Sequence, residues 1–142
     1  MESLNRRWVL VAEDDAPIRN LLAYNLGRAG YEVEKAANGL EAMERIREEI
    51  RVAVVDLRMP GADGWTVLRY FRAFHPSIPV VMVSANAQEE DIESLLRAGA
   101  FGFVCKPFRL GELLERIREA EASRAGAEQG RGGGRESDAK VP

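Results

Sequence analysis

Residues 52–65 read VAVVDLRMPGADGW, an apolar run that ends in an aspartate and continues into a glycine-containing loop. The run Val52–Asp56 is short and almost purely aliphatic, as strands buried on both faces of a parallel sheet are. Gly61 and Gly64 favour a bend in the loop beside Asp56. After the loop, four apolar residues stand at helical spacing, namely Val67, Leu68, Phe71 and Phe74. The stretch predicts a strand, a bent loop and a helix, with Asp56 at the carboxyl end of the strand.

The same succession of an apolar run and a helix-period segment occurs five times along the chain. We expect strands at residues 8–12, 31–35, 52–56, 80–83 and 101–105. The helices between and after them carry apolar stripes, such as Leu22 and Leu26 in the first and Leu113 and Ile117 in the last. Strands joined by single helices run parallel and need helices on both faces of the sheet. The pattern therefore predicts an α/β fold.

The residue pattern within the expected strands indicates their order in the sheet. The runs at 8–12, 52–56 and 80–83 are aliphatic, as interior strands are, whereas residues 31–35 alternate polar and apolar as an edge strand does. An order of 2-1-3-4-5 places the alternating strand at an edge and the aliphatic strands inside. We predict a flavodoxin-like, doubly wound sheet of five parallel strands with five helices.

Composition and charge narrow the class of protein. The chain has 142 residues, of which 46% are hydrophobic and 30% charged, as in one globular domain. The net charge of −3 gives no general attraction to nucleic acid or anionic lipid, and no apolar run has the length of a membrane span. Cys105 is the single cysteine, so no internal disulfide forms, and we expect a small buried hydrophobe. We expect a cytoplasmic domain that binds neither nucleic acid nor membrane.

The end of the chain has a different composition. Residues 123–142 read SRAGAEQGRGGGRESDAKVP and offer almost nothing to bury. Four basic and three acidic side chains give this segment a charge of +1, which leaves −4 for residues 1–122. Its glycines and mixed charges favour a disordered tail or a linker over a nucleic-acid-binding arm. We therefore place the folded domain at residues 6–122 and the tail or linker at 123–142.

Carboxylates follow two strands that the predicted order makes neighbours. Glu13, Asp14 and Asp15 come directly after the first strand, and Asp56 ends the third. Ligands of such sheets bind beyond the carboxyl ends of the strands, where the strand order reverses. Two carboxylates about 4 Å apart repel by roughly 4 kcal/mol in a partly screened site, so the cluster needs a proton or a cation. Hard oxygen ligands favour Mg²⁺ or Mn²⁺ over zinc. Asp15 is explained equally well as a helix cap.

A hydroxyl and an ammonium come at the ends of the fourth and fifth strands. Ser84 follows the strand at 80–83, and Lys106 follows the strand at 101–105. Either residue alone is more often a turn residue or a solvated surface residue. Together, at strand ends that face Asp56, they could hold phosphoryl oxygens by position and charge.

The chain contains the four motifs VLVAEDDAPIRNLL, VVDLRMPGADGW, VVMVSA and GAFGFVCKPF. In this order and spacing they resemble the receiver domain of two-component response regulators, a CheY-like domain, over residues 7–121. The resemblance implies that Asp56 accepts a phosphoryl group from the phosphohistidine of a sensor histidine kinase or a phosphotransfer protein. The domain would be a signalling protein and not an enzyme, one that catalyses only its own phosphorylation and slow dephosphorylation.

The resemblance also implies the ligands of a metal ion. Asp14 and Asp56 would bind Mg²⁺ directly, and Mn²⁺ could replace it. Glu13 would contribute through a water molecule or as part of the acidic pocket, and the backbone carbonyl of Arg58 would complete the protein's ligands. These roles are carried to the positions in this sequence that match the motifs quoted above.

A conformational switch is a further implication of the resemblance. Ser84 and Lys106 would contact the phosphoryl oxygens, and the bond between Lys106 and Pro107 would be cis. Phosphorylation would draw Ser84 inward, and Phe103 would turn into the space that Ser84 leaves. Phe103 is explained equally well as an ordinary core residue of its strand.

The face of the fourth helix, fifth strand and fifth helix would control an effector domain or partner protein. Ile92, Leu96 and Phe101 make this face apolar, where receivers of winged-helix regulators carry charges that pair across a dimer. We expect apolar contact with another protein, with a homodimer on phosphorylation as an alternative. Ordinary burial is the competing explanation for some of the three residues.

Three other functions share parts of this pattern. A haloacid-dehalogenase-like phosphatase would need a second aspartate two residues after Asp56, where Arg58 stands. A flavodoxin would need a hydroxyl- and glycine-rich phosphate loop after the first strand, where the chain is acidic instead. The complete site argues against a pseudo-receiver, which is never phosphorylated, without excluding it.

Overall fold

The computed structural model describes residues 6–85 and 88–129. In these residues, five parallel strands and five helices alternate along the chain. The strands are β1 (Trp8–Ala12), β2 (Glu32–Ala36), β3 (Ile50–Asp56), β4 (Val80–Ser84) and β5 (Gly102–Cys105). The helices are α1 (Ala16–Arg28), α2 (Gly39–Glu44), α3 (Gly64–Phe74), α4 (Glu89–Arg97) and α5 (Leu110–Gln129). The predicted alternation is confirmed, although five of the ten strand ends differ by one or two residues from those expected.

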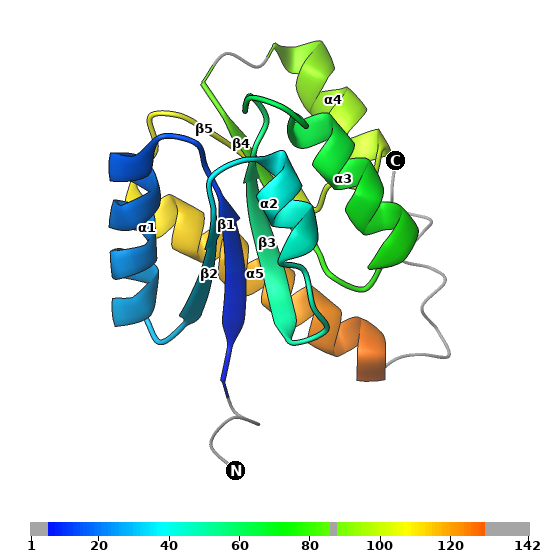
Figure 1. Cartoon of the computed structure of the whole chain (residues 1–142). Coiled ribbons are helices and arrows are strands. Elements are labelled where there is room, and N and C mark those ends of the chain that lie inside the picture. Colours follow the sequence, from blue (N-terminus) through cyan, green and yellow to red (C-terminus); the bar gives the residue numbers. More distant parts are fainter. Residues whose placement is uncertain (1–5, 86–87, 130–142) are drawn as a thin grey trace.

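The sheet has the order β2-β1-β3-β4-β5, as the residue pattern of the strands predicted. Figure 1 shows α1 and α5 on one face of the sheet and α2, α3 and α4 on the other. The order reverses between β1 and β3, which are paired in parallel. The fold is therefore the flavodoxin-like doubly wound sheet, and its switch point lies between the ends of β1 and β3.

Each face of the sheet has its own apolar core. Val9 and Val11 of β1 pack in one core with side chains of α1 and α5. Leu10 and Ala12, the alternate residues of the same strand, pack in the other core with side chains of α2, α3 and α4. Because successive side chains of a strand point to opposite faces, a strand between two cores is apolar at every position. This arrangement explains the aliphatic runs and holds the interior strand ends in fixed positions.

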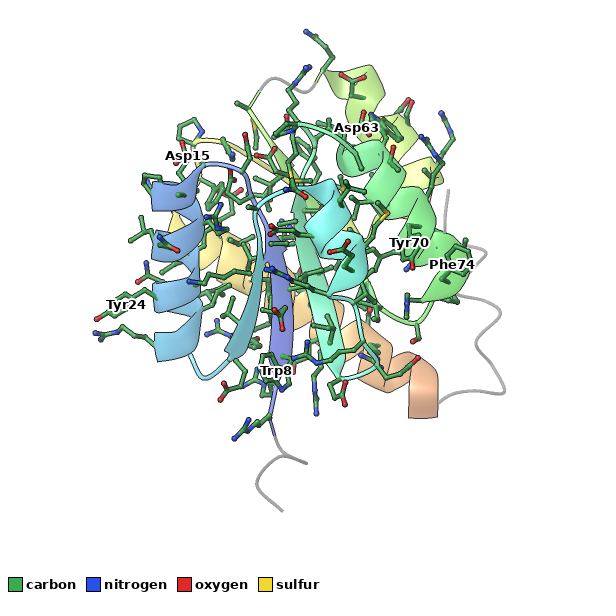
Figure 2. The ribbon with its side chains drawn as sticks, in the orientation of Figure 1. Trp8, Asp15, Tyr24, Asp63, Tyr70 and Phe74 are labelled. Atoms are coloured by element: carbon green, nitrogen blue, oxygen red, sulfur yellow. The ribbon has the colours of Figure 1, made fainter. Side chains whose placement is uncertain are left out.

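Aspartate caps begin two helices at the carboxyl edge of the sheet. The Asp15 carboxylate accepts a hydrogen bond from the Ile18 N–H at 3.2 Å, and that of Asp63 accepts one from the Thr66 N–H at 3.0 Å. Figure 2 shows Asp15 and Asp63 at the same end of the molecule, with Trp8 at the opposite end. Such a cap satisfies an N–H that the helix leaves free and stabilises by about 1 kcal/mol. The alternative that makes Asp15 a helix cap is therefore confirmed.

Two glycines shape the loop between β3 and α3. Gly61 has a φ of +75°, a conformation that glycine adopts at little cost. A Cβ atom on Gly64 would lie 2.6 Å from the carbonyl oxygen of Asp56 and 2.6 Å from the Cα of Leu57. Only a residue without a side chain allows α3 to begin so close to the end of β3. The predicted bend beside Asp56 is confirmed.

The last helix, α5, continues past residue 122, where we expected the folded domain to end. Residues 123–129 are helical and are not part of a disordered tail, while residues 130–142 lie outside the described residues. The Arg124 guanidinium donates to the carbonyl oxygen of Ile50 at 2.6 Å, so this end of the helix is anchored at the start of β3. A segment rich in Ala, Arg, Glu and Gln forms a helix readily, even with little to bury. Neither α5 nor another helix of the described ranges has the length and apolar character needed to cross a membrane.

Candidate functional site

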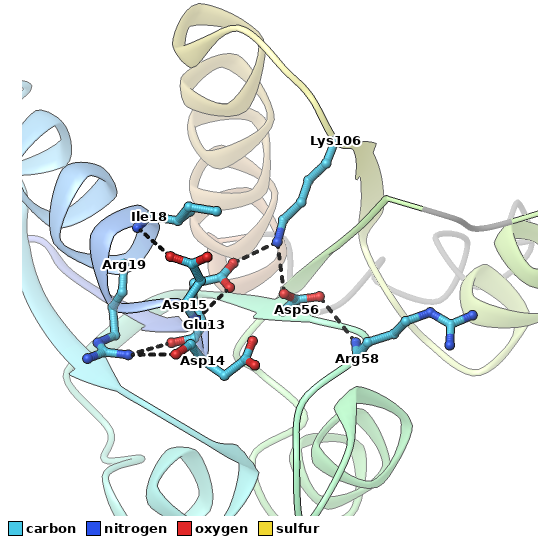
Figure 3. A network of polar contacts seen from close by, with 8 residues as sticks. All are labelled: Glu13, Asp14, Asp15, Ile18, Arg19, Asp56, Arg58 and Lys106. Atoms are coloured by element: carbon cyan, nitrogen blue, oxygen red, sulfur yellow. Dashed lines mark hydrogen bonds and ion pairs between the residues drawn. The ribbon is translucent and has the colours of Figure 1, made fainter.

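Lys106 joins two buried carboxylates at the carboxyl end of the sheet (Figure 3). Its Nζ lies 2.9 Å from Oε1 of Glu13 and 2.9 Å from Oδ2 of Asp56. Glu13 follows β1, Asp56 ends β3, and Lys106 follows β5. Only 3% of Glu13 and 6% of Asp56 is exposed. The strand order thus brings together three charged residues that lie far apart in the sequence.

Burial and hydrogen bonding shift the pKa values of Glu13 and Lys106. Burial raises the pKa of Glu13, an effect that the hydrogen bonds from Lys106 and from the backbone of Asp15 only partly offset. Burial acts to lower the pKa of Lys106, but its hydrogen bonds to Glu13 and Asp56 outweigh burial, and the pKa is raised. Lys106 is therefore a cation at neutral pH, and two carboxylates share it.

Asp14 completes a group of three carboxylates. One oxygen from each of Glu13, Asp14 and Asp56 lies within 4.8 Å of the other two. Asp14 is exposed, so the group opens to solvent. Three carboxylates (−3) and the Lys106 ammonium (+1) give a formal charge of −2. Closely spaced hard oxygens with this charge fit Mg²⁺ or Mn²⁺, since the group contains no imidazole or thiolate.

The backbone of Arg58 contacts the other oxygen of Asp56. The Arg58 N–H donates to Oδ1 of Asp56 at 3.1 Å, so both oxygens of that carboxylate are hydrogen-bonded. Figure 3 shows the Arg58 side chain running away from Asp56. There it lines a pocket of about 480 Å³ together with Trp65 and Asp91. The predicted role of the Arg58 carbonyl as a metal ligand stays a prediction.

Ser84 is buried beside this group at the end of β4. Ser84 is only 1% exposed, and its Oγ has no hydrogen-bond partner among the described residues. The Lys106 N–H donates to the Ser84 carbonyl at 2.9 Å, which fixes the ends of β4 and β5 relative to each other. A buried hydroxyl without a partner costs about 1–3 kcal/mol, so its presence suggests a function. The Lys106–Pro107 peptide bond is cis, as the resemblance implied.

For two residues of β5 the sequence predicts an interior position, as the sole interpretation for Cys105 and as one of two for Phe103. Phe103 is half-buried and packs against the core that α2, α3 and α4 cover, opposite Met82 of β4. Cys105 is exposed, so the expectation that it is a buried hydrophobe was wrong. It is the last residue of an edge strand, which has a neighbouring strand on one side only.

The sequence analysis did not single out Arg19, which contacts the acidic loop after β1. Its Nη1 donates to the carbonyl oxygens of Glu13 at 2.8 Å and Asp14 at 3.4 Å. Arg19 lies four residues after the helix cap Asp15, and its own N–H donates to the Asp15 carbonyl at 2.8 Å. That spacing was the signal available in the sequence, because helix geometry places such residues on one face.

The face that we expected to carry the signal is partly apolar and exposed. Leu96 of α4 is 42% exposed and Phe101, just before β5, is 37% exposed. Ile92 is half-buried, so it contributes less to this surface. Leu96 and Phe101 therefore form the exposed part of the predicted patch. Partial burial explains why the third residue, Ile92, is apolar.

Comparisons with known proteins agree with the fold and identify the family. The family model of the response regulator receiver domain matches residues 9–118. Response regulator protein PilR of Pseudomonas aeruginosa is 35% identical in a match that covers 86% of this chain and 29% of PilR. Transcriptional regulatory protein GltR of the same species is 36% identical in a match that covers 92% of this chain and 55% of GltR. The chain thus spans about half or less of these two relatives.

A solved structure shows the same fold over nearly its whole length. It is a CheY-like response regulator receiver domain protein from Methanospirillum hungatei JF-1, with 30% sequence identity and a TM-score of 0.80. The match covers 85% of this chain and 98% of that one. These similarities rule out the flavodoxin and haloacid-dehalogenase-like alternatives. The chain belongs to the receiver domain family of two-component response regulators.

Proposed function

We propose that Asp56 accepts a phosphoryl group from the phosphohistidine of a sensor histidine kinase or a phosphotransfer protein. An oxygen of the Asp56 carboxylate attacks phosphorus, an O–P bond forms, and the N–P bond of the donor breaks. The electron pair of that bond stays on the imidazole, which takes a proton from solvent. The observation that carries the proposal is the buried Asp56 carboxylate, held by Lys106 within a group of three carboxylates.

The same proposal assigns the metal site. Asp14 and Asp56 would bind Mg²⁺ or Mn²⁺ directly, Glu13 would take part through a water molecule, and the Arg58 carbonyl would complete the protein's ligands. The formal charge of −2 on the group supports a divalent cation. When bound, such an ion neutralises charge on the phosphoryl oxygens during transfer. The raised pKa of Glu13 also favours a nearby cation, because without one this buried carboxylate retains protons more readily.

Lys106 and Ser84 hold the transferred group. The Lys106 ammonium contacts Asp56 already and stays close enough to donate to a phosphoryl oxygen attached there. The Ser84 hydroxyl is buried at the same edge, and among the described residues no acceptor takes its proton. A phosphoryl oxygen supplies that acceptor. The modified side chain therefore gains two charge-assisted bonds, one from Lys106, which contacts Asp56 before transfer, and one from the Ser84 hydroxyl, which moves toward it.

The output of the domain follows from the movement of Ser84. Its hydroxyl moves toward the phosphoryl group, Phe103 turns into the space it leaves, and the face of α4, β5 and α5 changes shape. The exposed apolar side chains of Leu96 and Phe101 then contact an effector domain or partner protein in the cytoplasm. Alternatively, two copies of the domain form a homodimer through the same face. The domain catalyses no reaction other than its own phosphorylation and dephosphorylation.

Intact-mass spectrometry tests the proposed transfer. The protein is incubated with Mg²⁺ and acetyl phosphate, beside the variants Asp56→Asn and Asp63→Asn. Asp63 is the matched control, since it is an aspartate that caps α3 and lies outside the carboxylate group. We expect a phosphoryl adduct on the wild type and on Asp63→Asn but none on Asp56→Asn. No adduct on the wild type would favour a pseudo-receiver.

A further inference from the structure

The loop between β1 and α1 consists of three successive carboxylates that point in different directions. Glu13 is hydrogen-bonded to Lys106, Asp15 caps α1, and Asp14 joins the group with Glu13 and Asp56. Like charges on neighbouring residues repel, so side chains alone do not hold this arrangement. To bind a cation in a defined geometry, the loop needs other groups that hold its backbone in place.

Hydrogen bonds to the backbone fix the loop, and one of them runs within it, from the Asp15 N–H to Oε2 of Glu13 at 3.1 Å. The Glu13 N–H donates to the Ala36 carbonyl of β2 at 3.0 Å. The carbonyl oxygens of Glu13 and Asp14 both accept from one nitrogen of Arg19, at 2.8 Å and 3.4 Å. Figure 3 shows the Arg19 guanidinium beside these two carbonyls, on the side of the loop away from Lys106. Arg19 itself is half-buried and belongs to α1, which the Asp15 cap holds in place.

We infer that Arg19 is a positioning residue for the proposed metal site, an inference that rests on the function proposed above. Its guanidinium binds the backbone carbonyls of Glu13 and Asp14 on the side of the loop away from Lys106, so that their carboxylates stay directed at Asp56. The two carboxylates are then already in position before the ion binds, so that less conformational entropy is lost on binding. Arg19 touches neither the ion nor the phosphoryl group.

The charge of Arg19 and its hydrogen bonds predict opposite effects of substitution. A positive charge beside the site repels a cation, so its removal alone would strengthen metal binding. Loss of the backbone contacts frees the loop and weakens metal binding. A role confined to stability would change the melting temperature and leave the affinity of the folded protein for metal unchanged. The sign of the change in affinity therefore identifies the role.

The test is a titration with Mn²⁺ in which the free ion is followed by electron paramagnetic resonance, at a temperature where every variant is folded. We expect Arg19→Gln to raise the dissociation constant about tenfold, as loss of groups that orient metal ligands does. Arg28→Gln is the matched control, because it removes the same charge from the exposed end of the same helix. It should bind Mn²⁺ as the wild type does. Circular dichroism melts of the metal-free proteins measure the folded fraction.

Arg19→Lys gives a second variant that keeps the charge. Its ammonium sits on a shorter side chain and reaches at most one of the two carbonyls, so we expect a smaller rise in the dissociation constant. It replaces Arg19→Gln if that variant does not fold. Mn²⁺ affinity equal to or higher than that of the wild type in the folded variant overturns the inference alone. A wild type that binds no Mn²⁺ overturns the proposed metal site, and the inference with it.

Discussion

The Nζ atom of Lys106 lies 2.9 Å from Oδ2 of Asp56, although 50 residues separate the two in the chain. The contact joins the end of β3 to the residue after β5, with β4 between them. Glu13 shares the same ammonium at 2.9 Å, which leaves one cation between two buried acids. Lys106 therefore stabilises the two carboxylates, and under the proposed function it is in place to bind the phosphoryl group.

Replacement of Lys106 separates these two roles. We expect Lys106→Met to slow adduct formation at Asp56 about a hundredfold, as the loss of a group that stabilises transition-state charge does. The same change should strengthen Mn²⁺ binding, because the ammonium no longer repels the ion. Intact mass against time and the Mn²⁺ titration measure the two effects. Arg109→Met removes an exposed cation three residues away and should change neither. Wild-type transfer in Lys106→Met would contradict the role given to this residue.

Ser84→Ala should weaken function without weakening the fold. The hydroxyl is buried and has no partner among the described residues, so its removal leaves the free energy of unfolding unchanged or raises it by up to about 1 kcal/mol. Adduct formation should be slower, since the phosphoryl group loses a donor. Urea unfolding and intact mass check the two expectations. A loss of stability well beyond 1 kcal/mol would mean that the hydroxyl is hydrogen-bonded in the folded protein.

The acid stability of the domain should depend on Glu121 of α5. Its carboxylate binds Arg7 at 2.8 Å and accepts from the Tyr31 hydroxyl at 3.1 Å. The hydrogen bond from Arg7 lowers the pKa of Glu121, more than burial raises it, from an ordinary value near 4.5. A folded-state pKa below the unfolded value stabilises the fold above about pH 4.5, and this contribution disappears as the pH falls through the lower, folded-state pKa.

Glu121→Gln should therefore lose about 2 kcal/mol of stability at pH 7 relative to the wild type. The difference should shrink as the pH falls below 4.5, because the carboxyl of Glu121 then becomes protonated in the unfolded chain before it does in the folded protein. Glu119→Gln is the control, because Glu119 forms an exposed pair with Arg116 and such pairs contribute little. Urea unfolding at several pH values gives the comparison. A difference that stays constant down to pH 3 would show that the charge of Glu121 is not the cause.

Gly39 at the start of α2 should not tolerate a side chain. A Cβ atom there would lie 1.9 Å from the carbonyl oxygen of Ala62, in the loop between β3 and α3. We expect Gly39→Ala to cost about 2 kcal/mol and to weaken Mn²⁺ binding, because the displaced loop carries Arg58. Gly27→Ala in α1 meets no atom within 4 Å and should stabilise the fold by about 0.5 kcal/mol. Equal stability of the two variants in urea would contradict the close approach.

The strand ends and the residues that follow them could be predicted from the sequence. Strands between two cores are aliphatic at every position, so the ends of β1, β3 and β4 stand out. The order of the strands then places Asp14, Asp56 and Ser84 at one edge. The motifs of the family supplied the roles of these residues, which charge and spacing alone left open.

Other features depend on tertiary contacts that the local pattern does not contain. The exposure of Cys105 follows from its place at the end of an edge strand, while its residue type suggested burial. The extension of α5 to Gln129 depends in part on the contact between Arg124 and the start of β3. The contact of Arg19 with two carbonyls depends on the path of the loop after β1. None of these three features follows from residue type alone, because one residue type fits several environments.

Borohydride reduction after phosphorylation tests the central claim most directly. An acyl phosphate on an aspartate is reduced to the alcohol, which converts the residue to homoserine, and tandem mass spectrometry of the digested protein locates it. After incubation with Mg²⁺ and a phosphodonor, we predict homoserine at position 56 and at no other aspartate, and none when the donor is omitted. Homoserine at Asp14, Asp15 or Asp63 instead, or at no position, would contradict the assignment of Asp56 as the phosphoacceptor.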